Sequence, residues 1–176
     1  MPRFKLVIEY DGSPYHGWQF QKEKPTVMGV LMDAIKTGIK IDKFELYGSG
    51  RTDAGVHALN QVAHLDIKTD LKPDRIKIAI NDALPATINI LQVEKVQDRF
   101  HARYDVQARS YIYHISTRRT AFGKKYAYWI KDSLDVEAMQ KAAKVFEGLH
   151  DFSSFGSPED EKSSSKVSII HISVEK

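Results

Sequence analysis

The order of hydrophobic periodicities in the first hundred residues is the feature that most restricts the fold. Four segments alternate or are rich in β-branched and aromatic residues, as strands are: residues 4–10, 44–47, 61–67 and 88–96. Two segments repeat at helical spacing, one capped by Thr26 and expected to stop near Gly38, the other opening at Pro73. The resulting β-α-β-β-α-β order predicts an α+β fold of the ferredoxin-like kind, an antiparallel sheet with helices on one face.

The second part of the chain predicts a shorter β-α-β pattern. Residues 106–117 alternate with Arg109 and Tyr111 on one face, which suits a strand that presents side chains into a cleft. Residues 135–146 predict a helix, 167–174 a strand, and the Ser-rich stretch 151–165 a mobile loop. We therefore expect either a small second unit or an incomplete one.

Charge and composition narrow the class of protein. The 176 residues carry a net charge of +3 and no cysteine, which excludes disulfides, thiolate metal sites and a cysteine nucleophile. No apolar run is long enough to cross a bilayer, so we expect a soluble, cytoplasmic protein. Basic residues gather between 99 and 131 among tyrosines and Trp129, which suits a polyanion with stackable bases, or else a solvated Lys/Arg-rich surface.

The glycine-rich segment 48–55 carries the candidate chemistry. It follows a predicted strand, but it has neither the Gly-Lys-Ser/Thr of a P-loop nor the helix of a dinucleotide site. Arg51 and Asp53 are two residues apart, so an extended backbone would let them pair or converge on one ligand. Asp53 could serve as nucleophile, general base or metal ligand, or could sit in a hairpin with an Asx turn and a surface ion pair.

The metal-ligand role is weak because the next carboxylate, Asp66, comes a whole strand later. His57 and His64 are seven residues apart and need not meet. For both histidines we expect hydrogen bonds within a loop or strand rather than proton transfer.

Residues 50–58, Gly-Arg-Thr-Asp-Ala-Gly-Val-His-Ala, resemble the signature of the bacterial tRNA pseudouridine synthase A family. Other stretches match that family in order along essentially the whole chain. They are residues 9–13 with 15–21, Asn81 with Leu84-Pro85, residues 100–103 with 108–113, and Gly148 with 150–155.

The resemblance implies an enzyme that isomerises uridine to pseudouridine in the anticodon arm of tRNA, without metal or cofactor and as a homodimer. Asp53 matches the catalytic aspartate that attacks the target nucleoside, on the base or on the sugar. Arg51 matches the arginine that pairs with that carboxylate and assists base extrusion, and Tyr111 the tyrosine that stacks on the target base.

Further residues are expected to contact the tRNA. Trp18, Gln19 and Gln21 either line the RNA path or pack their own loop. Five arginines are candidates for phosphate contacts, which would make binding salt-dependent: Arg99, Arg103, Arg109, Arg118 and Arg119.

The chain also departs from the family. Met28 stands where the family usually has glutamine, residues 163–166 replace a segment that usually carries an arginine, and the family continues past Lys176 with a Phe-rich strand and a Met-Val-Arg helix. The resemblance implies two ferredoxin-like (RRM-like) halves with antiparallel sheets flanking a central cleft. Because the family's last strand and helix are absent, we expect the second half to be incomplete in a truncated chain. The expected domains are residues 1–104 and 105–176.

Two other functions stay open at this point. One is an RNA-binding fragment of that family that lacks activity because its C-terminal part is missing. The other, from the fold alone, is a metal-dependent nuclease that uses Asp53 and Asp66.

Overall fold

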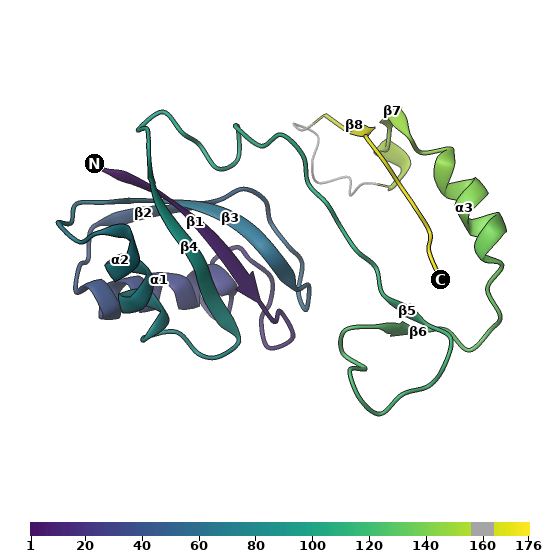
Figure 1. The fold of residues 1–176 in the computed structure, drawn as a ribbon, viewed down its shortest axis with the longest axis horizontal. Helices are drawn as coiled ribbons and strands as arrows, with labels where there is room; N and C mark the ends of the chain where they lie inside the picture. The colour runs from purple at the N-terminus through teal and green to yellow at the C-terminus, as the bar shows by residue number, and fades with distance from the viewer. Residues whose placement is uncertain (156–163) are drawn as a thin grey trace. The chain divides into compact units, whose positions relative to one another are not determined.

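The computed structural model describes residues 1–155 and 164–176, and it divides into two compact units, Met1–Tyr111 and Ile112–Lys176. The first unit contains a four-stranded antiparallel sheet in the order β2-β3-β1-β4 (Figure 1). Its elements run in the predicted β-α-β-β-α-β order: β1 Arg3–Tyr10, α1 Val27–Ile39, β2 Phe44–Gly48, β3 Ala58–Ile67, α2 Pro73–Asn81 and β4 Ile88–Val96. The sequence prediction of these six elements is confirmed.

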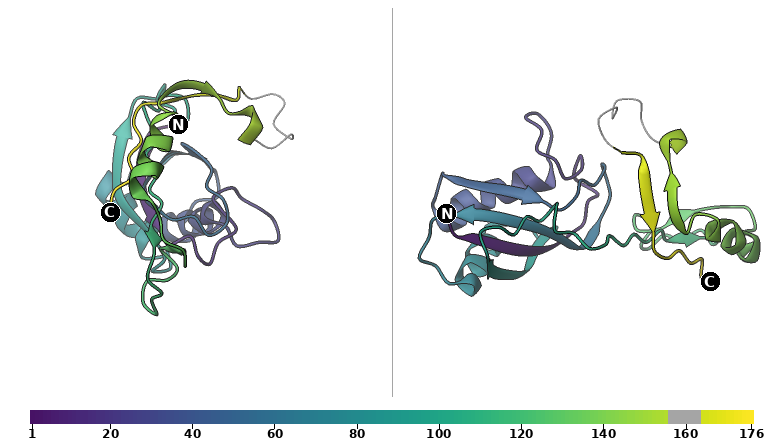
Figure 2. Two further views of the ribbon diagram at one scale, coloured as in Figure 1. Left: turned by 90° about the vertical axis from the view of Figure 1, so that its right-hand side faces the viewer. Right: turned by 90° about the horizontal axis from the view of Figure 1, so that it is seen from above.

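The main core of the first unit lies between the sheet and its two helices. Alternate residues of β1 point to this side, so that Leu6 and Ile8 are fully buried. The helices add apolar residues to the same cluster, among them Ile35 of α1 and Ile80 of α2. Burying each such side chain stabilises the fold by roughly 1.5–3 kcal/mol, which holds α1 and α2 on one face of the sheet (Figure 2).

Helix α1 begins and ends where the sequence predicts. The Thr26 Oγ1 accepts a hydrogen bond from the Gly29 amide at 3.2 Å, as an N-cap does. The helix ends at Ile39, next to Gly38, and its C-cap is Lys40, whose φ of 59° is left-handed. The prediction that the helix stops near Gly38 is confirmed. Gly38 also has a second role: a Cβ there would lie 2.0 Å from the carbonyl oxygen of Ala79, so this glycine lets α1 and α2 touch.

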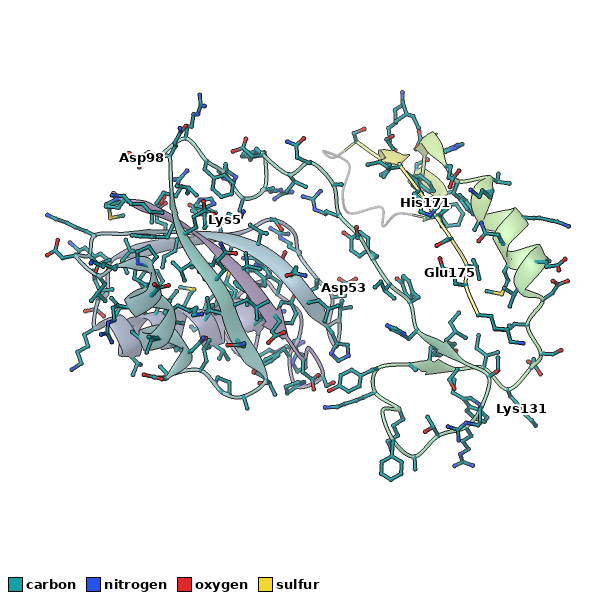
Figure 3. All side chains as sticks on the ribbon, in the orientation of Figure 1. Lys5, Asp53, Asp98, Lys131, His171 and Glu175 are labelled. Atoms are coloured by element: carbon teal, nitrogen blue, oxygen red, sulfur yellow. The ribbon has the colours of Figure 1, made fainter. Side chains whose placement is uncertain are left out.

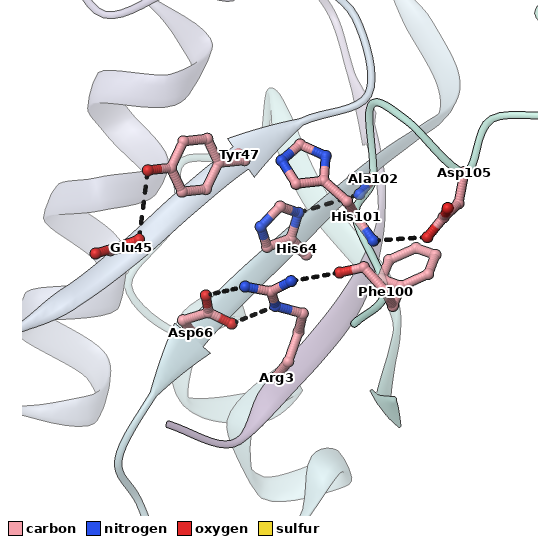
Figure 4. A network of polar contacts seen from close by, with 9 residues as sticks. All are labelled: Arg3, Glu45, Tyr47, His64, Asp66, Phe100, His101, Ala102 and Asp105. Carbon is pink, nitrogen blue, oxygen red and sulfur yellow. Dashed lines mark hydrogen bonds and ion pairs between the residues drawn. The ribbon is translucent and has the colours of Figure 1, made fainter. Parts of the chain in front are cut away.

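The opposite face of the sheet is partly covered by the chain that follows β4. We call residues 100–109 the strap. The Ala102 amide donates to Nδ1 of the buried His64 at 3.1 Å, and Arg3 donates to the Phe100 carbonyl at 2.6 Å while its other nitrogens hold Asp66 (Figure 4). His64 and Asp66 are therefore buried on the face that a simple two-layer fold would leave open.

The second unit is built from short elements. β5 Ile115–Ser116 pairs in parallel with β6 Tyr128–Trp129, and β7 Gly148–Asp151 pairs antiparallel with β8 Lys166–Ile169. Helix α3 Val136–Lys144 and a 3-10 turn, Ser153–Phe155, complete the described part. The predicted helix 135–146 is confirmed, and Asp135 caps it by accepting from the Ala138 amide at 2.9 Å.

Two strand predictions in this region are wrong in extent. Of residues 106–117, only 115–116 form a strand, and of residues 167–174 only the first three do. A strand needs a neighbour for its backbone groups, and within the described residues 106–114 belong to no sheet. Most of the loop predicted at 151–165 falls on 156–163, outside the described residues.

The described residues thus form an α+β protein with one four-stranded antiparallel sheet and three α-helices. Of these three helices, none combines the length and apolar character needed to cross a membrane.

Candidate active site

The glycine-rich loop, residues 49–57, joins β2 to β3 at one end of the sheet. Asp53 lies there, at the end of the first unit where β3 begins (Figure 3). Ser49 anchors the start of the loop, because its amide donates to the Val62 carbonyl at 2.8 Å and its hydroxyl to Gln61 Oε1 at 2.8 Å. Gln61 in turn donates to the Gly50 carbonyl at 3.0 Å.

A second loop, residues 11–18 after β1, holds the tip of the glycine-rich loop. The Trp18 amide donates to the Thr52 carbonyl at 3.0 Å, and the Gly55 amide donates to the Tyr15 carbonyl at 3.2 Å. The Gly12 amide donates to Nδ1 of His57 at 3.1 Å. These bonds fix the backbone on both sides of Asp53.

Two glycines make this contact possible. A Cβ at Gly12 would lie 1.9 Å from the Val56 carbonyl oxygen, and one at Gly17 would lie 2.5 Å from that of Thr52. Gly17 also has φ +86°, which side-chain-bearing residues rarely adopt. The two loops therefore meet backbone against backbone, with no room for a side chain between them.

Trp18 packs the loop instead of lining an RNA path. Its side chain is only 1% exposed, and its indole lies where a Cβ on Gly48 would come within 2.6 Å. For Trp18 the packing alternative is therefore correct. Gln19 and Gln21 are exposed, and Gln21 donates to the His16 carbonyl at 3.0 Å.

Asp53 itself is exposed. Its main-chain carbonyl accepts from the Val56 amide at 3.2 Å, whereas its carboxylate has no hydrogen bond or ion pair with any residue in 1–155 or 164–176. The Asx turn is not formed, because the Gly55 amide donates to Tyr15 instead. Arg51 is also exposed and, within the same ranges, forms no ion pair with Asp53. The carboxylate is thus held on a fixed backbone with its oxygens available to a ligand.

Arg109 is brought to the loop by the strap. Its Nη2 donates to the Ser49 carbonyl at 2.7 Å, and its Nε lies 3.4 Å from the position a Cβ on Gly50 would take. The side chain is exposed, so the remaining guanidinium donors face solvent beside the loop. The structure therefore places one predicted phosphate-binding arginine in contact with the Asp53 loop.

Within the first unit, no hydrogen bond or ring contact joins Arg103 or Tyr111 to Asp53. Arg103 lies in the strap, exposed, with its amide donating to His101 Nδ1 at 3.2 Å. Tyr111 is 73% exposed and has no ring contact with the described residues. In the second unit, Arg119 lies over the Trp129 ring, 5.9 Å from its centroid.

Sequence reasoning missed one buried polar pair in the site. The Tyr10 hydroxyl and Thr52 Oγ1 are 2.8 Å apart, and Tyr10 is only 4% exposed. The alternation of β1 places Tyr10 on the core face, but only the folded loop shows that its hydroxyl reaches the residue before Asp53.

The two histidines behave as expected, since both accept hydrogen bonds from backbone amides. Burial, aided by the charges of Arg3 and His101, lowers the pKa of His64 to about 4, so this imidazole is neutral at neutral pH. Its lone pair on Nδ1 is then free to accept from Ala102.

A shared metal site for Asp53 and Asp66 is excluded by geometry. Asp66 lies eight residues along β3 from Ala58, roughly 25 Å from the strand's beginning beside the Asp53 loop. Both of its oxygens are held by Arg3, at 2.6 and 2.5 Å. Among the described residues no cluster of three His, Cys, Asp or Glu side chains could hold a metal ion.

Known proteins resemble this chain over almost its whole length. The family model described as tRNA pseudouridine synthase matches residues 6–105, which include both loops of the site. The tRNA pseudouridine synthase A of Afipia carboxidovorans is 42% identical over 99% of this chain and 72% of its own length. Those of Nitrobacter winogradskyi and Rhodopseudomonas palustris are 44% and 46% identical, over 99% and 88% of this chain and 69% and 64% of theirs.

Proposed function

Because the chain belongs to the tRNA pseudouridine synthase family, a family of isomerases, we propose that it converts uridine to pseudouridine in the anticodon arm of tRNA, with Asp53 as its catalytic carboxylate. The match over 99% of the chain supports the reaction. The resemblance of residues 50–58 to the family signature supports the choice of residue.

The observation that carries this proposal is the way the fold presents Asp53. Hydrogen bonds from Trp18 and Gly55 fix the backbone on either side of it, while the carboxylate has no partner among the described residues. A reactive group held on a fixed backbone and left free of internal contacts is preorganised for a substrate.

The reaction is an isomerisation, so it consumes no second substrate. The bond between uracil N1 and ribose C1′ breaks, the base turns, and C5 forms a new bond to C1′ while its proton is released and N1 takes one up. The Asp53 carboxylate assists by attacking either the base or C1′. Both routes require a group with an accessible oxygen, which the loop supplies.

The substrate is proposed to contact side chains around the same loop. Arg51 assists base extrusion, which costs a few kcal/mol. Arg109, already bound to Ser49 at the loop, and Arg103 on the strap contact phosphates, while Gln21 lines the RNA path. Tyr111 stacks on the extruded base; its 73% exposed ring is available for this.

For the whole chain we propose two domains, residues 1–104 and 105–176, each of ferredoxin-like (RRM-like) type. The strand order β2-β3-β1-β4 with two helices on one face supports this for the first domain. We further propose a homodimer that meets its tRNA in the cytoplasm. Light scattering that gives the mass of one 20.0 kDa chain at micromolar concentration would contradict the dimer.

The test is incubation of the chain with an unmodified tRNA transcript, followed by mapping of pseudouridine. We expect product in the anticodon arm from the unaltered chain and none from Asp53→Ala, with tRNA binding retained by both. Salt-sensitive binding without product from the unaltered chain would instead establish an RNA-binding protein that lacks catalysis.

A further inference from the structure

Thr52 is the residue through which the fold holds Asp53. Its carbonyl accepts from the Trp18 amide at 3.0 Å, and its hydroxyl lies 2.8 Å from the hydroxyl of Tyr10. Since the Asp53 carboxylate has no partner among the described residues, its position depends on the backbone to which it is attached. That backbone is anchored on its N-terminal side by Thr52.

Tyr10 supplies the side-chain half of this anchor. It is the last residue of β1, a central strand, and it pairs with Ala58 of β3 on one side and Ile88 of β4 on the other, which holds its backbone in the sheet. Its ring is 4% exposed and lies 6.1 Å, centroid to centroid, from that of Trp18. Burial raises the pKa of Tyr10, so its hydroxyl stays protonated at neutral pH.

We propose that Tyr10 is a positioning residue for the reaction: its hydroxyl, bonded to Thr52, sets the place of the Asp53 carboxylate relative to the target nucleoside. The proposal rests on the proposed function. Tyr10 touches no reacting atom, so it acts on the rate and not on tRNA affinity.

The decisive variant is Tyr10→Phe, which keeps the ring against Trp18 and removes only the hydroxyl. We expect kcat to fall about 10- to 100-fold, because displacing a reactive group by a fraction of an ångström to an ångström has effects of that size. The KM for tRNA should change less than about threefold, because no group that binds tRNA is altered. Thr52→Val should reproduce the loss, and Thr52→Ser, which keeps a hydroxyl, should recover most of it.

The chain offers a matched control. Asn81 of α2 forms two side-chain hydrogen bonds with β4: its Nδ2 donates to the Ile90 carbonyl at 2.9 Å, and its Oδ1 accepts from the Ile90 amide at 2.8 Å. Asn81→Ala removes these bonds without touching either loop of the site, so it costs at least as much stability as Thr52→Val. We expect Asn81→Ala to leave kcat and KM unchanged, which separates positioning of Asp53 from general loss of a hydrogen bond.

Amide hydrogen exchange tests, without any activity measurement, whether Tyr10 fixes the loop that carries Asp53. Tyr10→Phe and Thr52→Val should speed exchange of the Trp18, Gly55 and Val56 amides by about tenfold, and Asn81→Ala should not. If the unaltered chain forms no pseudouridine, the proposed function fails, and the exchange rates alone decide whether Tyr10 fixes the loop. The proposal is overturned if Tyr10→Phe leaves loop exchange unchanged, if it leaves kcat unchanged in an active chain, or if Asn81→Ala has equal effects.

Discussion

At the scale of single residues, buried polar groups on the strap side of the sheet are all accounted for by specific partners. His64 accepts from the Ala102 amide, and Asp66 binds Arg3, whose guanidinium also reaches the Phe100 carbonyl. His64 and the ring of Tyr47 stack with centroids 5.0 Å apart. The strap is therefore held at two points. The neutral imidazole of His64 on β3 accepts from it, and Arg3 of β1, paired with Asp66 of β3, donates to it.

This arrangement predicts how stability depends on pH. The pKa of His64 is lowered to about 4, below its ordinary value near 6.5, so between these values the unfolded chain binds more protons. The contribution of His64 to the free energy of unfolding is therefore complete above pH 6.5 and is lost as pH falls towards 4. The loss from this residue is at most about 3 kcal/mol. Urea unfolding at a series of pH values between 7.5 and 4 measures the loss. The fluorescence of Trp18 in a Trp129→Phe variant monitors each unfolding transition.

His64→Asn is the control for that measurement, because an amide oxygen can accept from Ala102 without titrating. Its stability should fall less than that of the unaltered chain over the same range. Parallel pH curves for the two proteins would show that His64 does not carry the effect.

At the scale of elements, the two helices of the first unit are placed by one close contact. A Cβ at Gly38 of α1 would lie 2.0 Å from the Ala79 carbonyl oxygen of α2, which is closer than non-bonded atoms approach. The contact is backbone to backbone, so no side-chain movement can relieve it. The position of Gly38 thus sets how near the helices lie and how both cover the sheet.

Gly38→Ala is expected to destabilise the first unit by more than about 2 kcal/mol, because the overlap outweighs the gain of roughly 1 kcal/mol in helix propensity. Thr37→Ala, on an exposed neighbouring position of α1, should be neutral or slightly stabilising. Thermal and urea unfolding of the two variants give the comparison. Equal stabilities would mean that the helices separate freely.

The same contact explains where sequence reasoning about elements succeeds and where it fails. Periodicity and capping residues located α1 and α2, since Thr26 and Pro73 act locally. The sequence could not show that Gly38 serves a neighbouring helix, because this depends on packing between segments forty residues apart. Residues 106–114 alternate as a strand does, yet among the described residues they have no strand to pair with.

In the candidate site, too, the sequence locates the motif but does not show its long-range contacts. Asp53 and its glycine-rich loop could be located from the motif, but the pairing of Arg51 with Asp53 and the RNA-facing role of Trp18 could not be judged without contacts. The Tyr10–Thr52 bond joins residues 42 apart and leaves no local pattern.

At the scale of the whole molecule, apolar burial is concentrated in the first unit. Of the described residues, the buried apolar side chains all belong to Met1–Tyr111 except Ala143 of α3. The second unit instead exposes large apolar residues, such as Phe122 and Tyr113, both 90% exposed. Since stability follows apolar burial, the two units should differ strongly in resistance to opening.

Hydrogen exchange read by mass spectrometry tests this difference. Peptides from β1, β3 and β4 should stay protected for hours, whereas those from residues 112–155 should exchange within seconds to minutes. Adding unmodified tRNA should slow exchange in the second unit if it folds against its substrate. Equal protection of both units in the free chain would contradict the account.

The most direct test of the central claim is the release of tritium from tRNA whose uridines are labelled at C5, because this atom loses its hydrogen only when the new carbon–carbon bond forms. Under single-turnover conditions with enzyme in excess, the unaltered chain should release tritium from the anticodon arm. Asp53→Asn, which changes one oxygen to nitrogen on an exposed side chain, should bind the tRNA equally and release none. Release by Asp53→Asn at the rate of the unaltered chain would show that Asp53 is not the catalytic carboxylate.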